Sequence, residues 1–392
     1  MKETRERVIN LAQELVKRPS TTGEEGALAE YLRSVLPDYG FDEAEIDPYG
    51  NVIGRIGEPA PGGLLFDGHI DTVGVHNPLE WQHNPLGGEV NHEKIYGRGI
   101  SDMKGAIAAA LVAVAELREE GWTPLAPFWF SGTVCEEVAE GALLEKVIDW
   151  VQPDKVIIGE ATSLHLAVGQ RGRAEIVLEA IGKSAHSAHA EIGINAIERA
   201  MQALVQIQTK FKAPRSVFLG EGSLVATDII SDPYPGRSVV PSRCVVTFDR
   251  RVLLGESAQS VIQALADCLP PELGVLVRLA SYSLKTYTGH TITGESFAPA
   301  WYVDPAHELV QDALDCLNKA GIQTGLKTYG FCTNGSGSAG KRKIFTLGFG
   351  PGHEGDAHIT DEALVIDQLV GAVQGYKELF RSLVRGGRSG CQ

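Results

Sequence analysis

Apolar residues recur every three or four positions along two stretches near the N-terminus. They run through residues 8–16 and 28–36, and Pro-Ser-Thr-Thr-Gly at 19–23 stands between them. This period is typical of helices that bury one face, and proline and glycine commonly end helices. The pattern therefore predicts two amphipathic helices joined by a loop.

Short apolar runs bounded by turn residues follow these helices. They occupy residues 51–56, 63–67, 128–132 and 155–160, and an alanine- and leucine-rich stretch at 104–120 lies among them. Runs of this length are typical of buried strands, and the longer stretch predicts a helix. Alternating strands and helices indicate an α/β domain whose sheet is covered by helices on both faces.

The pattern changes after Gly172. Alternating or apolar runs predict strands at 174–180, 243–249 and 274–280, with amphipathic helices at 194–211 and 257–268 between them. This order predicts a small α+β unit. Because the helix-strand alternation resumes near residue 304, we expect an α/β domain formed by 1–171 and 289–392, interrupted by an inserted α+β domain at 172–288.

Composition and charge argue against certain binding partners, namely nucleic acids and membranes. The chain has 392 residues, 43% of them hydrophobic, and a formal net charge of −15. Such an acidic chain offers no basic surface for nucleic acid or an anionic membrane. Its longest apolar stretch, 106–115, is shorter than the roughly 20 residues of a membrane span, and its charged N-terminus does not fit an export signal. With six scattered cysteines, we expect a cytoplasmic protein without disulfides.

The first candidate metal-site residues along the chain are His69 and Asp71, which follow a predicted buried strand. In an extended segment these two side chains share a face, so the carboxylate can hold one imidazole nitrogen and leave the other for a metal. Asp102 lies just before the helix at 104–120, where a helix N-cap is the competing interpretation. Adjacent Glu136 and Glu137 follow another strand, and they either lie in a solvated loop or face a cation.

Two further segments complete the candidate set. Glu160 ends an apolar strand, and α/β folds bind ligands at such strand ends. The glycine-rich segment 350–362 contains His353 and His358, both candidates. Imidazoles and carboxylates together suit zinc, a bridging aspartate suits a pair of zincs, and a second glutamate can act as general base. There is no HExxH motif, which excludes the helix-borne zinc protease design.

The order of these motifs along the chain resembles that of a known family. Residues 68–73, 97–105, 136–137, 159–160 and 357–362 match, in order, motifs of the zinc-dependent metallopeptidase and deacylase family of acetylornithine deacetylase, succinyl-diaminopimelate desuccinylase, aminoacylase and glutamate carboxypeptidase. Residues 134–138, 158–162, 169–175, 231–236 and 247–251 look closest to the selenium-metabolism-linked hydrolase subgroup. The resemblance implies a zinc-hydrolase catalytic domain with a mixed sheet and an inserted lid and dimerisation domain.

The resemblance also implies roles for individual residues. It assigns His69 and Glu160 to one zinc ion and Glu137 and His358 to the other, with Asp102 as the bridge. Asp71 orients His69, and Glu136 is the general base. Two Zn²⁺ ions per subunit are implied, with Co²⁺ or Mn²⁺ as other metals that the site could take.

In the inserted domain, the resemblance implies that His186 reaches the active site of a partner subunit in a homodimer. There it would donate a hydrogen bond to the developing oxyanion. Arg251 matches an arginine that can hold a substrate carboxylate, although an ion pair at a strand end explains it nearly as well. Asn334 lies where relatives carry substrate-proximal residues.

Three functions compete. The first is a metal-dependent amidohydrolase that removes an acyl or carbamoyl-like group from a small amino-acid derivative, by a zinc-activated water. The second is a dipeptidase or carboxypeptidase with the same dinuclear site. The third is a non-catalytic binding or scaffold protein, which predicts loss of the base or of a ligand. The presence of Glu136, Asp102 and His358 favours an enzyme.

Overall fold

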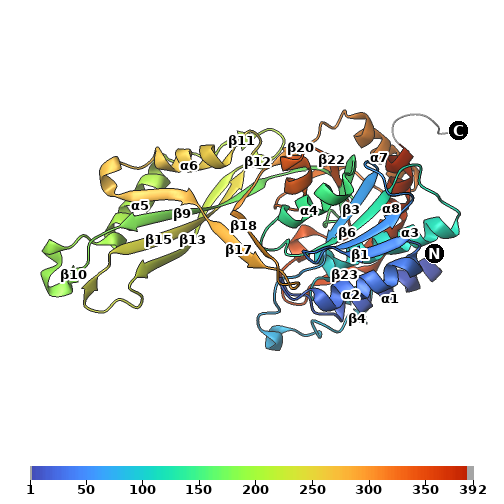
Figure 1. Cartoon of the computed structure of the whole chain (residues 1–392), viewed down its shortest axis with the longest axis horizontal. Coiled ribbons are helices and arrows are strands. Elements are labelled where there is room, and N and C mark those ends of the chain that lie inside the picture. Colours follow the sequence, from blue (N-terminus) through green and yellow to red (C-terminus); the bar gives the residue numbers. More distant parts are fainter. Residues whose placement is uncertain (1, 386–392) are drawn as a thin grey trace.

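The computed structural model describes residues 2–385, and two lobes are seen in it (Figure 1). The helices of this range are α1 (Lys2–Val16), α2 (Gly26–Val35), α3 (Gly105–Glu119), α4 (Ala142–Val151), α5 (Ala196–Lys210), α6 (Ala258–Ala266), α7 (Glu308–Lys319) and α8 (Ile366–Arg385). The expected helices at 8–36 and 104–120 are confirmed as α1, α2 and α3. No helix among the described residues is long and apolar enough to cross a membrane.

The larger lobe is built on a mixed nine-stranded sheet. Its strands are β1 (Glu43–Ile46), β2 (Val52–Ile56), β3 (Leu64–His69), β6 (Phe128–Thr133), β7 (Lys155–Ile158), β8 (Leu166–Gln170), β20 (Trp301–Tyr302), β21 (Leu326–Tyr329) and β22 (Phe345–Gly348). The order is β1-β2-β6-β3-β7-β22-β8-β20, and β21 pairs with β8. The central strands β6, β3, β7 and β22 run parallel.

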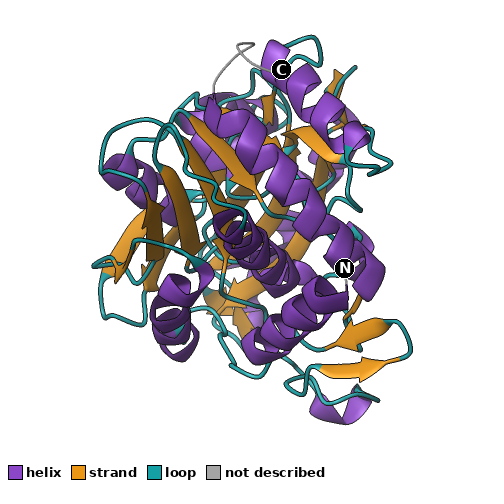
Figure 2. Cartoon of the chain, turned by 90° about the vertical axis from the view of Figure 1, so that its right-hand side faces the viewer, coloured by secondary structure: helices purple, strands orange, loops and turns teal. Residues whose placement is uncertain are grey.

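Helices cover both faces of this sheet (Figure 2). Successive residues of β3 point to opposite sides, so Phe66 joins the core formed with α1, α3 and α8, whereas Leu65 joins the core formed with α4. The central strands are therefore buried along their whole length. This explains why they occur in the sequence as continuous apolar runs rather than as alternating ones.

The smaller lobe holds an antiparallel five-stranded sheet, which lies on the left in Figure 1. Its strands are β9 (Gly172–Ile181), β13 (Ser223–Asp232), β15 (Arg243–Val252), β16 (Val275–Leu279) and β19 (Phe297–Ala298). One face packs on α5 and α6 around Ile176, Val246 and Val261. The predicted α/β domain with an inserted α+β unit is thus the observed fold class.

Two elements of the smaller lobe were not predicted from the sequence. β13 is an edge strand whose side chains are mostly exposed, so it lacks the alternating burial that marks β15. A hairpin of β17 (Ser281–Lys285) and β18 (Thr291–Glu295) pairs only with itself among the described strands. Its tip returns to the larger lobe, where Tyr287 Oη donates to Gly50 O at 3.1 Å. The expected domain boundary at residue 288 falls within this hairpin tip. Beyond it, β19 still pairs with β9 of the smaller lobe. The domain bounds therefore stay a prediction.

Short strands connect the main elements. They are β4 (Glu89–Asn91), β5 (Lys94–Tyr96), β10 (Ala185–His186), β11 (Arg215–Ser216), β12 (Gly220–Glu221), β14 (Val239–Val240) and β23 (Ala363–Val365). β23, β5 and β4 form one small sheet, and β10 pairs with β14. The five cysteines at 135, 244, 268, 316 and 332 are free thiols, as expected, and Cys391 lies outside the described residues.

Candidate metal centre

Three parallel strands of the large sheet end at the same edge, and each carries candidate residues at or just beyond its last position. His69 is the final residue of β3, Glu136 and Glu137 follow β6, and Glu160 follows β7. β3 lies between β6 and β7. The common edge therefore brings side chains from distant sequence positions together, where open α/β sheets bind ligands.

The carboxylate of Asp102 lies between the two predicted histidine ligands. His69 Nε2 is 2.9 Å from Asp102 Oδ1, and His358 Nε2 is 3.1 Å from Asp102 Oδ2. His69 Nε2 is also 3.4 Å from Glu160 Oε1, whereas His358 Nε2 is 3.0 Å from Glu137 Oε2. Two groups of ligand-type atoms thus meet at Asp102, each with one imidazole and one further carboxylate.

Asp71 supports both His69 and the loop that follows β6. The His69 Nδ1 atom lies 2.9 Å from the Asp71 carbonyl oxygen and 3.6 Å from its Oδ1, so the nearer acceptor is the main chain. Because a carbonyl only accepts, this contact needs the proton on Nδ1 and leaves Nε2 free to bind a metal. The Asp71 carboxylate accepts hydrogen bonds from the backbone N–H groups of Glu136 and Glu137 at 2.9 and 3.1 Å.

Glu136 differs from its neighbours in the bonding of one carboxylate oxygen. Its side chain is buried, and its Oε1 has no hydrogen-bond partner among the described residues. Burial raises the pKa of Glu136 well above its usual range. A buried carboxylate whose free oxygen lies beside histidines and acids can accept a proton from a bound water.

Burial and mutual repulsion perturb the acids of this cluster. Burial, together with the charge of Asp102, raises the pKa of Glu160 to about 7, and burial raises that of Glu137. Burial acts on Asp102 as well, but hydrogen bonds from His358 and His69 outweigh it and lower its pKa. Contacts with Asp102 and Glu137 in turn raise the pKa of His358 to about 10.

The donor set fits divalent cations. Ligand atoms of His69, Glu136 and Glu160 lie within 4.8 Å of one another, and so do those of His69, Asp102 and Glu137. Four carboxylates and two imidazoles leave an excess of negative charge in a largely buried place, which protons offset unless a cation is bound. Mixed nitrogen and oxygen donors at this spacing suit zinc, and cobalt or manganese accept the same donors.

The structure resolves two alternatives that the sequence left open. Asp102 is not a helix cap, because α3 begins at Gly105 and no side chain caps its first turn. His353 is exposed and its Nδ1 accepts a hydrogen bond from the backbone N–H of Gly355, so it caps a short turn. Of these two histidines, only His358 contacts the cluster among the described residues.

The predicted residues of the smaller lobe do not join the cluster within one chain. His186 is exposed on β10, and its Nδ1 accepts a hydrogen bond from the Ala188 backbone N–H at 3.0 Å. Nearby His189 is also exposed and lies 3.6 Å from Glu191. No contact between His186 and a residue of the metal cluster is present among residues 2–385.

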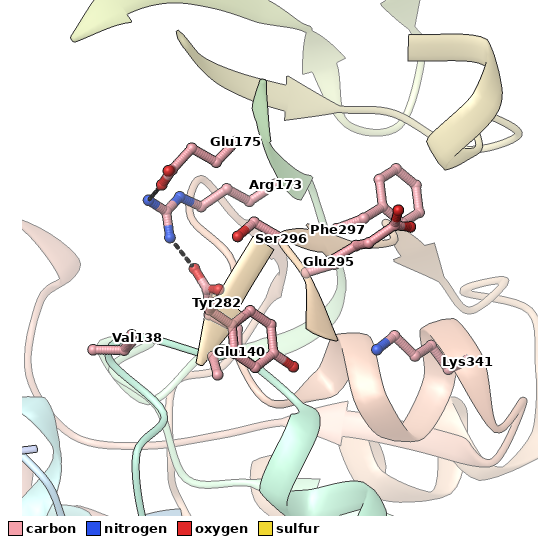
Figure 3. A pocket seen from close by; sticks show the side chains of 11 residues that line it. Val138, Glu140, Arg173, Glu175, Tyr282, Glu295, Ser296, Phe297 and Lys341 are labelled. Atoms are coloured by element: carbon pink, nitrogen blue, oxygen red, sulfur yellow. Dashed lines mark hydrogen bonds and ion pairs between the residues drawn. The ribbon is translucent and has the colours of Figure 1, made fainter. Parts of the chain in front are cut away.

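Arg251 belongs to a chain of ion pairs that reaches the larger lobe. Its Nε lies 3.0 Å from Asp249 Oδ1, and Arg173 Nε lies 2.8 Å from Asp249 Oδ2. Arg173 also contacts Glu140 at 3.0 Å, four residues beyond Glu136. Arg173 and Glu140, but not Arg251, border a cavity of about 30 Å³ between the lobes, in which Arg173 points toward Glu140 and Glu175 (Figure 3). The guanidinium of Arg251 therefore already has a carboxylate partner.

Asn334 is buried behind the strand ends, and its amide group is used inside the protein. Its Nδ2 donates to Asp67 Oδ2 and Thr133 Oγ1, both at 2.9 Å, and its Oδ1 accepts from the Gly141 N–H at 2.8 Å. Burial raises the pKa of Asp67 to about 6. Through these hydrogen bonds Asn334 connects β3, β6 and the start of α4. One acceptor site on its Oδ1 remains for a substrate.

Some buried acids near the centre were missed or given no role by sequence reasoning. Glu25 is fully buried and its Oε1 accepts from the backbone N–H of Cys135, the residue before Glu136. Glu362 contacts the segment that carries Asp102. Both lie far from their partners in the sequence, and neither follows a buried strand, so no local pattern marks them.

Comparison with known proteins shows the family to which the chain belongs. The sequence of the chain matches peptidase family M20/M25/M40 over residues 65–382. It is 31% identical over 367 residues to protein YgeY of Escherichia coli K12, described as uncharacterized, covering 91% of this chain and 90% of that protein. It is 28% identical over 260 residues to the succinyl-diaminopimelate desuccinylase of Rhodospirillum centenum, covering 62% and 67%.

Among solved structures, the M20 family metallo-carboxypeptidase Sso-CP2 from Sulfolobus solfataricus superposes with a TM-score of 0.76 at 17% identity, covering 96% of this chain and 99% of that one. The chain belongs to peptidase family M20/M25/M40. It is therefore a metallohydrolase that acts on C–N bonds, in a family with a dinuclear metal site.

Proposed function

We propose that the protein hydrolyses the amide bond of a small N-acyl or carbamoyl-like amino acid. The observation that carries this proposal is the placement of Asp102 between His69 and His358, beside the unpartnered Glu136 oxygen. The arrangement provides two ligand groups that share one carboxylate, and a proton acceptor next to them. Both are needed for metal-assisted hydrolysis.

In this proposal His69 and Glu160 would hold one divalent ion, His358 and Glu137 would hold the other, and Asp102 would serve both. Zinc, when bound, lowers the pKa of a water and polarises the amide carbonyl. Glu136 accepts a proton from the attacking water and delivers it to the leaving nitrogen as the C–N bond breaks. Asp71 keeps Nε2 of His69 available through the Nδ1 contact.

The substrate side of the proposal rests on Arg251 and Asn334. Arg251 would receive a substrate carboxylate, exchanging its present contact with Asp249. Asn334 would contribute at most one acceptor, because its other positions are occupied. A desuccinylase among the relatives supports an acylated amino acid as substrate.

The alternative is a dipeptidase or carboxypeptidase reaction at the same site. It is favoured by the likeness in fold to the metallo-carboxypeptidase Sso-CP2. Both reactions require the same metal site and the same base. They differ in which groups flank the scissile bond, and residues of the smaller lobe would decide between them.

The proposal includes a homodimer formed through the smaller lobe, in which His186 completes the partner's site. β13 is an edge strand, and Val225, Ile229 and Ile230 are exposed along it. Such an edge can pair with a second copy, which would cover its apolar side chains. The exposure of His186 in the single chain agrees with a role at another subunit.

Three finer assignments belong to the same proposal. Membership of the selenium-metabolism-linked subgroup rests on the matching segments, such as 134–138 and 169–175. A cytoplasmic location is supported by the free thiols. The lobes are assigned to 1–171 with 289–392, and to 172–288.

One experiment tests the function directly. Metal content per subunit is measured before and after chelation, together with hydrolysis of a panel of N-acyl amino acids, carbamoyl amino acids and dipeptides. We expect two metal ions, loss of activity with the chelator and recovery with zinc, with faster turnover of acylated amino acids. Faster turnover of dipeptides would favour the alternative, and absence of metal at His69, Asp102 and Glu160 would contradict both.

A further inference from the structure

Glu362 joins the segment that carries His358 to the segment that carries Asp102. It lies four residues after His358, immediately before β23, and it is fully buried. Its backbone oxygen accepts a hydrogen bond from the Gly97 N–H at 2.9 Å. The two segments are more than 250 positions apart in the sequence, so this contact exists only in the folded chain.

The carboxylate of Glu362 receives four hydrogen bonds from the Asp102 segment. Its Oε1 accepts from the backbone N–H groups of Ser101 at 2.8 Å and Asp102 at 3.2 Å. Its Oε2 accepts from the backbone N–H of Gly99 at 3.0 Å and from Arg98 Nη1 at 2.7 Å. One side chain thus provides the acceptors for three backbone groups in a row of four residues.

These backbone groups have no regular structure to hold them. Asp102 has φ −129° and ψ 88°, which is not helical, and Gly99 is in the left-handed region at φ 79°. A buried N–H without an acceptor is costly, so the segment depends on Glu362 for its conformation. Because Asp102 Oδ2 is 3.1 Å from His358 Nε2, that conformation also sets the distance between the two predicted ligands.

We propose that Glu362 is a positioning residue that fixes Asp102 against His358 and thereby sets the affinity for the second divalent ion. The inference rests on the proposed function, in which Asp102 bridges two metals. Glu362 is not among the predicted metal ligands, and its carboxylate bonds to residues 98–102. It acts through the backbone of residues 99–102.

The competing explanation is that Glu362 only balances the buried charge of Arg98. Removing one partner of a buried ion pair leaves an unpaired charge, which can unfold a protein regardless of any metal. The two explanations separate when both charges are removed together. Part of the acceptors for the backbone N–H groups is then lost while no buried guanidinium stays unpaired.

The test compares four variants of the full-length protein. Glu362→Gln removes two of the four acceptor positions, because an amide nitrogen donates. Arg98→Met removes the ion pair and keeps all three backbone hydrogen bonds, and Glu362→Gln/Arg98→Met removes both. Asp361→Asn is the matched control. Asp361 also accepts two backbone hydrogen bonds, but from the N–H groups of Gln82 and His83, and the loop that contains Gln82 and His83 has no predicted ligand.

Each metal-free protein is titrated with Zn²⁺ in a calorimeter, and the absorption spectrum of its Co²⁺ form is recorded. Thermal unfolding is followed in parallel. We expect Glu362→Gln and the double variant to bind the second ion about 10–100-fold more weakly, as is typical when an outer contact of a ligand is lost. Their Co²⁺ spectra should change, whereas Arg98→Met and Asp361→Asn should stay close to wild type in both measurements.

Wild-type metal affinity and an unchanged Co²⁺ spectrum in a folded double variant would overturn the inference. So would a loss of affinity that follows Arg98→Met as strongly as Glu362→Gln. If the wild-type protein itself bound no second ion, the proposed dinuclear function would fail first, and the inference with it. The wild-type titration therefore separates the two failures.

Discussion

The two lobes of this protein place their functional candidates in opposite environments. In the large sheet, β3 and β6 are buried from end to end, and the candidates occur where these strands stop. In the smaller lobe, β15 alternates between buried and half-buried residues, and the candidates Arg251 on β15 and His186 on the short strand β10 lie at or near the surface. The first set is assembled within one chain, whereas the second is not.

The difference shows what each sheet can contribute. A doubly covered parallel sheet excludes water along the strands and gathers their ends at one edge, so it can hold charged groups in fixed contact. An antiparallel sheet with an exposed edge can instead present residues to another molecule. We therefore expect the larger lobe to supply the metal ligands and the general base, and the smaller lobe to complete the site of a partner subunit.

The largest effect is expected from Glu136→Gln in the large lobe. The amide cannot accept a proton, so kcat should fall by about 10²–10⁴-fold, the usual contribution of a general base. The metal content should stay unchanged, because the other cluster residues remain. Steady-state kinetics and metal analysis of the same preparation check this, and a variant that retained most of its kcat would show that another group is the base.

His186→Ala in the small lobe should lower kcat by about 10²–10³-fold, the cost of losing one oxyanion donor. His189→Ala is the matched control, since it removes an exposed imidazole from the same segment and should have little effect. The metal affinity of both variants should equal that of the wild type.

Mixing the two inactive variants tests whether the small lobe acts on a partner. After subunit exchange, half of the dimers pair Glu136→Gln with His186→Ala, and each has one intact site if His186 crosses over. Activity should then recover to about a quarter of the wild-type value in a two-fold symmetric dimer. No recovery in dimers shown to have exchanged would place His186 outside the reaction.

Arg251→Ala should act mainly on substrate binding. Loss of charged hydrogen bonds to a substrate carboxylate would raise KM by about 10–100-fold with a smaller change in kcat. The exposed Arg215→Ala serves as control. An unchanged KM would indicate that Arg251 only pairs with Asp249.

The smallest effect on catalysis is expected from Asn334→Ala. Its three hydrogen bonds lie inside the large lobe, so the variant should lose about 1–3 kcal/mol of unfolding free energy while KM changes little. Chemical denaturation compares it with Asn318→Ala, an exposed position on α7. A large rise in KM with unchanged stability would instead make Asn334 a substrate contact.

Sequence reasoning was successful where the relevant pattern is local. The strands before His69, Glu136 and Glu160 were predicted from their apolar runs, and a shared sheet edge follows from their order. β13 was missed because its side chains are mostly exposed and carry no burial pattern. The contact between the chain segments at Asp102 and Glu362 was missed because irregular loops carry no period that indicates their partners.

The amino-acid sequence by itself determined the class of fold, the set of acids and histidines, and their position at strand ends. These are properties of short segments, since periodicity and turn residues act over a few positions. Only the tertiary structure decided that the two oxygens of Asp102 face different imidazoles, that His353 stays outside the cluster and that His186 lies on the surface. Distances between loops depend on how whole strands and helices pack, and no single segment contains that information.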